Sequence, residues 1–492
     1  MEDYIAPWLE WEVLREPITI PNVDEAEELP EGNKKIVITR DEHYNLQAVL
    51  SMKGDCEFFR KETKNTVPGS FIELFEISGS DQYESERYTL ESCHIASIHR
   101  YVEDEEEPLC ESNLGVQGLK VKHNTESEGV SLTEWYLNGP SNFIAFRNRT
   151  ERKILSKLFR ERSVLGGRSA PGGEKIQSIE ISGRVAESSS FDFLRIQADE
   201  IQFLVTLVPK GLGPDWSSNV GIEYRKEGGN IPNPEDRKKI GELCSFILGR
   251  QLLSVGYTIY DEDCMLVEEY ACNPWRSHPE SLCSKPDKAP IKIDRASSRG
   301  KAEDLIGQLL PHYFELREPL HLKDALWLYW IGQEMTVETS LPLFAAAVEA
   351  IMNGWFNSKH TKSGGVYLDK ATLDELFQDE MSSIGEKLEG LEYGDELMKR
   401  FKNSNLMGVM DRFRFFFTEI DLPVDKNEWA AIKARHAVAH GRIPTEEDEW
   451  EQIIRYTDTY ETLIHKIILK LLGYSGSYIG RSVIGWEDKQ LV

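Results

Sequence analysis

The segment WEQIIRYTDTYETLIHKIILKLLG, residues 450–473, decides the fold of the C-terminal third of this chain. Its large apolar residues recur every three or four positions, the spacing at which side chains share one face of an α-helix. This stripe consists of Trp450, Ile453, Ile454, Tyr460, Leu463, Ile464, Ile467, Ile468 and Leu471. Gly473 then ends the pattern, as glycine often does after a helix. Because a one-sided apolar helix must pack on other helices, the segment predicts a helical bundle.

The chain from Lys301 up to this helix also has the pattern of α-helices. Thr339 and Ser340 are expected to cap a helix that runs through Asn353. Further helices are expected over 373–388, 395–403, 406–417 and 426–440. We therefore predict a helical domain over residues 301–480 and a C-terminal tail over 481–492.

The first 290 residues follow a different pattern. Short runs of β-branched residues are separated by Gly, Asp and Asn, which is typical of strands and turns. The Gly/Pro-rich segment 166–173 and the Pro/Lys/Ser-rich segment 285–300 are the expected linkers. They delimit a β-rich domain over 1–165 and an α+β subdomain over 175–290. A helix is expected over 234–251, and the charged segment 150–162 is also expected to be helical. The predicted fold class is α+β, with a β-rich N-terminal half followed by the helical bundle.

Composition narrows the class of protein. The 492 residues include 84 Asp and Glu against 57 Lys and Arg, a formal charge of −27. This acidity argues against a general nucleic-acid coat, because phosphate contacts need clustered cations; its main expected effect is solubility. No apolar run reaches the roughly 18 residues of a membrane span, and the first residues lack the pattern of a secretory signal. Seven cysteines without a CxxC pair favour free thiols in a cytoplasmic protein.

The run RHAVAHG, residues 435–441, contains the strongest candidates for catalytic side chains. A guanidinium forks onto phosphate oxygens, and imidazole moves protons near neutral pH. Arg435 and His440 lie about 140° apart on an ideal helix, and a last turn that loosens at Gly441 would bring them closer. The same residues also fit a structural interpretation, with a salt bridge at Arg435 and a histidine favoured by the helix dipole.

This motif and its setting resemble the HEPN superfamily. Its signature is an arginine with a polar neighbour, followed four to six residues later by a histidine; here these are Arg435, His436 and His440. Members usually carry Asn or Asp beside the arginine, so His436 is a less common variant. Glu349, alone in the apolar run 341–351, looks like the single acidic residue of the ApeA-like group, a bacterial anti-phage defence family. Residues 471–486 look like the C-terminal extension of that group.

The resemblance implies a metal-independent endoribonuclease that needs no cofactor and acts as a hydrolase in abortive infection. It also implies a homodimer in which two motifs face each other across a cleft for RNA. His440 is the expected base for the ribose 2′-hydroxyl, and Arg435 is expected to neutralise charge on the phosphate. His436 either takes part in proton transfer or orients Arg435. Glu349 either pairs with Arg435 or lies at the solvent edge. A phage-derived trigger is expected to act on the N-terminal half.

Two other functions stay open at this point. A non-catalytic HEPN protein would use the bundle for dimerisation or ligand binding, and a metal-dependent hydrolase would lose activity in a chelator. His436 and His440 do not form an HExxH motif. Cys264, Cys272, Cys283 and His278 lack the spacing of a zinc site. The sequence therefore predicts no metal site and no contact with a membrane.

Overall fold

In the computed structural model the described residues are 11, 14–25, 29, 34–53, 74–101, 109–125, 127–140, 146, 148–155, 158–164, 174–181, 185–209, 211–226, 230–274, 279–293, 301–358, 361, 364–439, 446–482 and 485–491. Side chains are described for the same residues except 100–101, 109, 151–155, 158–164, 174–181, 185–190, 280–281, 301 and 436–439.

Contacts within the chain divide it into two compact units. The first comprises residues 1–232, 252–287 and 294–304, and the second comprises 233–251, 288–293 and 305–492. Helix α2 (Pro234–Leu248) therefore belongs to the second unit, although strands of the first unit precede and follow it. The residues on both sides of the linker expected at 166–173 belong to the first unit, where they form the two strands of a hairpin.

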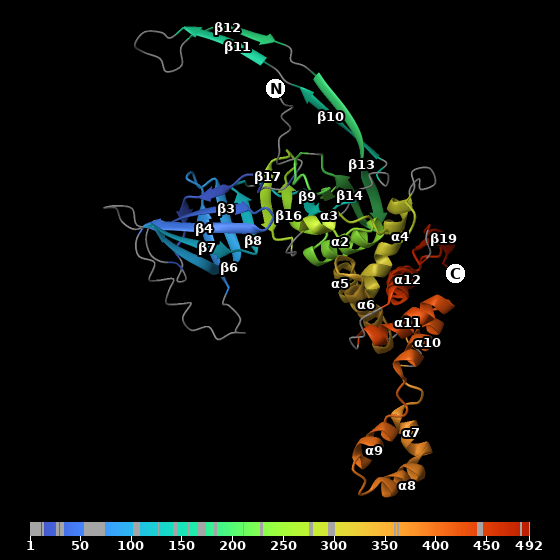
Figure 1. Ribbon diagram of the computed structural model, residues 1–492. Helices are drawn as coiled ribbons and strands as arrows, with labels where there is room; N and C mark the ends of the chain where they lie inside the picture. The colour runs from blue at the N-terminus through green and yellow to red at the C-terminus, as the bar shows by residue number, and fades with distance from the viewer. Residues whose placement is uncertain are drawn as a thin grey trace. The chain divides into compact units, whose positions relative to one another are not determined.

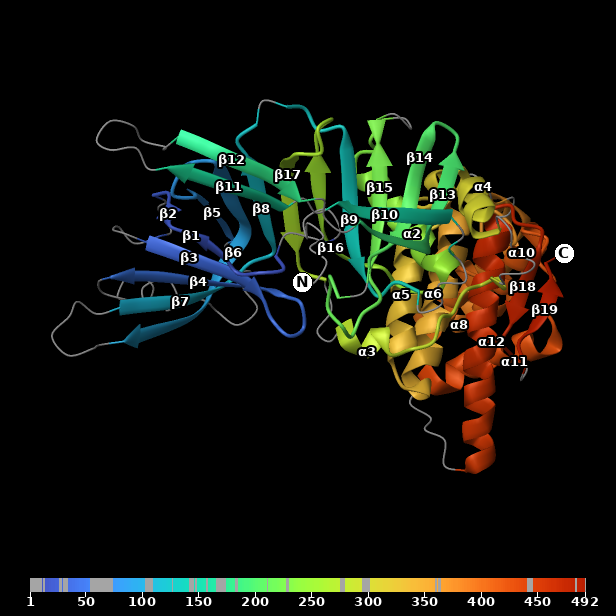
Figure 2. The ribbon, with the colours of Figure 1, turned by 90° about the horizontal axis from the view of Figure 1, so that it is seen from above.

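The first unit is built on a large antiparallel sheet. Its strands follow the order β1-β3-β4-β7-β6-β8-β17-β16-β9-β15-β14-β13-β10, with β2 and β5 beside β6, and β11 and β12 pair separately. Figure 2 shows β17, β16, β9, β15, β14 and β13 side by side. The strands are β1 (Ile18–Ile20), β2 (Asn22–Val23), β3 (Lys34–Arg40), β4 (Leu46–Lys53), β5 (Phe75–Ser80), β6 (Glu86–Tyr101), β7 (Leu109–Gly115), β8 (Gly118–His123), β9 (Ser131–Leu137), β10 (Asn148–Leu155), β11 (Leu158–Val164), β12 (Glu174–Ile181), β13 (Val185–Ala198), β14 (Ile201–Leu207), β15 (Val220–Arg225), β16 (Leu253–Tyr260) and β17 (Leu266–Cys272).

Two apolar clusters hold this unit together. Strand β6 joins two parts of the sheet, because its first half pairs with β5 and β8 and its second half with β7. Alternate residues of β3, β4, β6 and β8 form the larger cluster around Ile36, Leu50 and Leu90. The smaller cluster gathers Trp11 and Trp135 against the start of β16. Helix α3 (Pro279–Cys283) contributes Leu282 to the smaller cluster.

The second unit is helical. Helix α2 begins at the cap residue Asn233, whose side chain accepts a hydrogen bond from the backbone N–H of Asp236, and it ends at Gly249, which has a φ of 73°. Helices α6, α11 and α12 pack on one another, and α7, α8 and α9 form a separate group (Figure 1). The remaining bounds are α4 (Lys301–Leu316), which starts in the first unit, α5 (Leu322–Glu334), α6 (Val337–Asn357), α7 (Lys370–Leu376), α8 (Gln378–Leu388), α9 (Gly394–Lys402), α10 (Val409–Glu419), α11 (Lys426–Ala439), α12 (Glu447–Leu471), β18 (Ser477–Gly480) and β19 (Glu487–Gln490).

The predicted fold class is confirmed, since an antiparallel sheet over residues 18–272 precedes a helical region. The helix expected over 150–162 is wrong: the chain forms β10 and β11 there, and each strand is held by an antiparallel partner.

Cys110 is disulfide-bonded, so the expectation of free thiols fails at that residue. Among the described helices, none has both the length and the apolar character needed to cross a bilayer.

Candidate functional site

The candidate site lies on α11, whose first turn is fixed by a capping box. The Asp425 carboxylate accepts hydrogen bonds from the backbone N–H groups of Asn427 (2.8 Å) and Glu428 (2.9 Å). In return, the Glu428 carboxylate accepts from the backbone N–H of Asp425 at 2.8 Å. These contacts satisfy donors that an uncapped helix leaves open. The pattern Asp-x-x-Glu at residues 425–428 is the signal in the sequence for this helix start.

A buried ion pair joins the start of α11 to α12. Lys466 Nζ lies 2.7 Å from Glu428 Oε1, and each of the two side chains is only 6% exposed. Lys466 also donates to the backbone oxygen of Pro423 at 3.0 Å. Ala431 and Ile432 are fully buried one turn further along α11. Helix α11 is thus held at its first two turns by packing and by charge.

Arg435 lies one turn beyond this buried part of α11, where three other helices meet it. Its guanidinium forms an ion pair with Glu349 of α6. The guanidinium carbon lies 5.2 Å from the centre of the Phe413 ring of α10, within cation–π range. Tyr460 of α12 is also close. Burial raises the pKa of the Tyr460 hydroxyl, and the positive charge of Arg435 opposes that rise.

The Arg435 side chain is held firmly but is not fully covered. It is 16% exposed, and its partner Glu349 is 32% exposed. Its Nε atom is buried and makes no hydrogen bond within the described residues. A guanidinium has five N–H donors. One ion pair with Glu349 therefore leaves donors on Arg435 for a second anion.

Of the two histidines in the motif, the structure describes only the backbone of His436. His436 belongs to α11, but its side chain is not among those described, and His440 lies outside the described residues. Arg435 and Glu349, which are far apart in the sequence, are brought together. The roles predicted for His436 and His440 stay predictions.

A second polar cluster surrounds the middle of α12, and the sequence pattern did not reveal it. Glu461 forms ion pairs with Lys288 (2.7 Å) and with Arg481 (3.3 Å). His465 is fully buried and shares a hydrogen bond of 2.9 Å with Tyr329. Burial lowers the pKa of His465 well below its usual range, and the charges of Arg481 and Lys288 add to this. The cluster connects α12 to the segment 288–293 and to the C-terminal hairpin.

Neither metal-binding groups nor similarity to known proteins assigns a function to this site. Within the described residues, no group of three or more His, Cys, Asp or Glu side chains could hold a metal ion. No family model, curated protein or solved structure shows a significant match to this chain.

Proposed function

We propose that this chain is an endoribonuclease of the HEPN type, which cuts RNA without a metal ion at a site shared by two copies of the chain. In this proposal it acts in the cytoplasm of a prokaryote as an effector of anti-phage defence. The observation that carries the proposal is the environment of Arg435. Its guanidinium is positioned by Glu349 and Phe413 and still reaches solvent.

The reaction follows from the chemistry of RNA. The ribose 2′-oxygen attacks the adjacent phosphorus while His440, as the base, takes its proton. The bond from phosphorus to the 5′-oxygen breaks, and that oxygen takes a proton from a second histidine, either His436 or a histidine of the partner copy. Arg435 stabilises the negative charge that grows on the phosphate oxygens. The products are a 2′,3′-cyclic phosphate and a 5′-hydroxyl.

Glu349 serves in this proposal as a positioning residue. A carboxylate that holds one edge of the guanidinium limits the side chain to few rotamers, so less entropy is lost when phosphate binds. The same carboxylate partly neutralises Arg435 and would repel phosphate if it lay on the same side. The proposal therefore requires phosphate to approach the donors of Arg435 that face away from Glu349.

The second candidate is a non-catalytic HEPN protein that dimerises or binds a ligand. The ion pair favours it in one respect, because the charge of Arg435 already has a partner and the pair fits a structural role in the packing of α6 on α11. The two candidates differ in what Arg435→Ala and His440→Ala do to cells. An RNase is toxic when expressed in its active state, and either substitution removes that toxicity.

The test is expression in bacteria together with incubation of the purified chain with RNA. The proposal predicts growth arrest and RNA fragments that end in 2′,3′-cyclic phosphate, both unaffected by a chelator. Arg435→Ala and His440→Ala abolish both effects, whereas Lys433→Ala, an exposed residue of the same helix, does not. RNA that stays intact with wild-type protein, or fragments that form equally with His440→Ala, would reject the proposal.

A further inference from the structure

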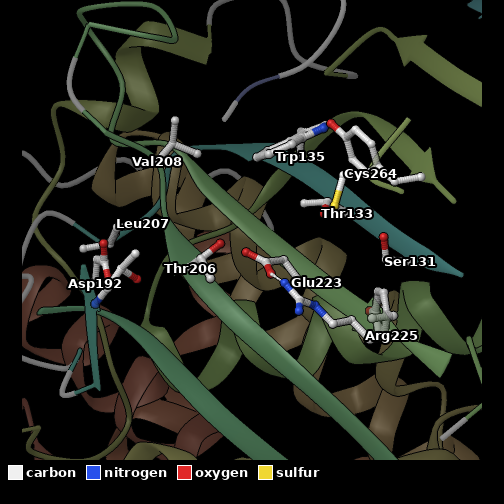
Figure 3. A pocket seen from close by; sticks show the side chains of 13 residues that line it. Ser131, Thr133, Trp135, Asp192, Thr206, Leu207, Val208, Glu223, Arg225 and Cys264 are labelled. Atoms are coloured by element: carbon white, nitrogen blue, oxygen red, sulfur yellow. Dashed lines mark hydrogen bonds and ion pairs between the residues drawn. The ribbon is translucent and has the colours of Figure 1, made fainter. Parts of the chain in front are cut away.

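A polar cavity of about 230 Å³ lies on one face of the sheet of the first unit (Figure 3). Its floor is formed by β9, β15 and β14. Glu223 of β15 is paired with Thr133 of β9, and Arg225 is paired with Ser131. Directly paired residues of antiparallel strands point to the same face. This register places polar residues of both strands in the cavity, while Ile222, on the opposite face, is fully buried.

Gly221 keeps the floor of the cavity open. A Cβ atom at this position would lie 3.0 Å from Oγ1 of Thr206, 3.1 Å from Cζ3 of Trp135 and 3.2 Å from Cγ2 of Thr133. These are tighter than ordinary van der Waals contacts, so even a methyl group would crowd the floor. The cavity therefore depends on glycine at the point where β15 passes between Trp135 and Thr206.

Three charged side chains line the cavity, and they differ in how far they are exposed. Asp192 is only 5% exposed, and its carboxylate accepts a hydrogen bond of 3.2 Å from the backbone N–H of Thr150. Glu223 lies 3.6 Å from Arg225, whose side chain is mostly exposed. Burial, followed by the charges of Glu269 and Glu223, raises the pKa of Tyr260 to about 12, so its hydroxyl is neutral. The lining thus holds two carboxylates and one guanidinium.

One hydroxyl of the lining opens onto the cavity. Thr133 is 8% exposed and lines the cavity (Figure 3), and its hydroxyl makes no hydrogen bond to the described part of the chain. A ligand hydroxyl at this place would gain a hydrogen bond to Thr133. Ser131, Thr150 and Thr206 add further hydroxyl groups to the lining.

We propose that this cavity binds a small molecule that carries an ammonium group together with hydroxyl groups, as an amino sugar does. The ammonium group would lie near Glu223 and Asp192, where it forms charge-assisted hydrogen bonds. The ligand hydroxyls would bond to Thr133 and its neighbours, and an apolar edge of the ligand would contact Trp135. This binding site is independent of RNA cleavage and stands whether or not Arg435 is catalytic.

The test is isothermal titration of the full chain with glucosamine and with glucose, which differ by one amino group. We expect saturable one-to-one binding of glucosamine, with glucose at least about tenfold weaker because it lacks the charge. Glu223→Gln keeps the size of the side chain and should weaken glucosamine about tenfold while leaving glucose unchanged. Thr133→Val should weaken both sugars several-fold.

Glu200→Gln is the matched control, because it removes one carboxylate from the exposed turn between β13 and β14. It should leave both affinities unchanged, which separates cavity binding from general attraction to an acidic chain. Circular dichroism shows whether each variant is folded, and Thr133→Val carries the test if Glu223→Gln is not. The proposal is overturned if glucosamine fails to bind saturably, or if both cavity variants bind glucosamine like the wild type.

Discussion

Two ion pairs tie α11 to its neighbours, and they differ in how far solvent reaches them. At the first turn, Lys466 and Glu428 are each 6% exposed. Near the other end, Arg435 and Glu349 are 16% and 32% exposed. A charge pair removed from water must be matched closely by its own partner. A pair at the edge of the bundle can exchange contacts with a solute. The comparison indicates that the first pair maintains the fold and that the second is accessible to a solute.

The largest effect is expected at the buried pair. Lys466→Ala leaves Glu428 buried without its partner and should lower the free energy of unfolding by about 3–5 kcal/mol. Chemical denaturation measures this. Lys433→Ala, on the exposed side of α11, should stay within about 0.5 kcal/mol of wild type. A loss below about 1 kcal/mol in Lys466→Ala would show that the first pair does not maintain the fold.

The next effect concerns His465, the buried histidine that precedes Lys466 on α12. Its pKa is lowered in the folded state, so below about pH 6.5 the unfolded chain takes up a proton that the folded chain does not. The free energy of unfolding should therefore fall as the pH drops from 6.5 toward 5, by up to about 1.4 kcal/mol per pH unit.

His465→Gln removes this titration and keeps a polar side chain opposite Tyr329. Denaturation curves measured between pH 5 and 8 should show a flatter pH dependence for the variant than for the wild type. Parallel pH profiles for the two proteins would contradict the assignment of a neutral, buried imidazole.

The exposed pair should behave in the opposite way, with little effect on stability and a clear effect on activity. Glu349→Gln keeps the side chain's shape but removes its charge, so Arg435 is held less firmly. RNA cleavage should slow about tenfold, while the free energy of unfolding changes by less than about 1 kcal/mol. Glu315→Gln, at an exposed position of α4, should change neither quantity. If Glu349→Gln lost as much stability as Lys466→Ala, the exposed pair would also maintain the fold, and the distinction between the two pairs would fail.

Much of the fold was predictable because it depends on short-range periodicity. The apolar stripe of α12 is buried at Ile453, Tyr460, Leu463, Ile464, Ile467 and Ile468, although Ile454 is exposed. The helix expected over 150–162 is wrong because the charged residues there hide the alternation of a strand, and the pairing partners lie between residues 177 and 190. Pairing with distant residues decided its structure, and local pattern does not contain that information.

The site was predictable only in part. The RHAVAHG run identified Arg435, and the isolated acid in an apolar helix identified Glu349. That these two side chains meet follows from the packing of α6 on α11, which no local spacing encodes. The buried charges of α12 escaped prediction for a related reason. Charged residues such as Glu461 and Lys466 are read as solvent-facing unless the residues that neutralise them are known.

The most direct test of the central claim is the single-turnover rate of RNA cleavage by wild type, Arg435→Lys and Arg435→Ala. If the guanidinium stabilises the developing phosphate charge, Arg435→Ala slows cleavage by about 10²–10³-fold, while its free energy of unfolding stays close to that of the wild type. Arg435→Lys should recover only part of the rate, because an ammonium group lacks the forked geometry. Equal rates for wild type and Arg435→Ala, with both proteins folded, would contradict the account.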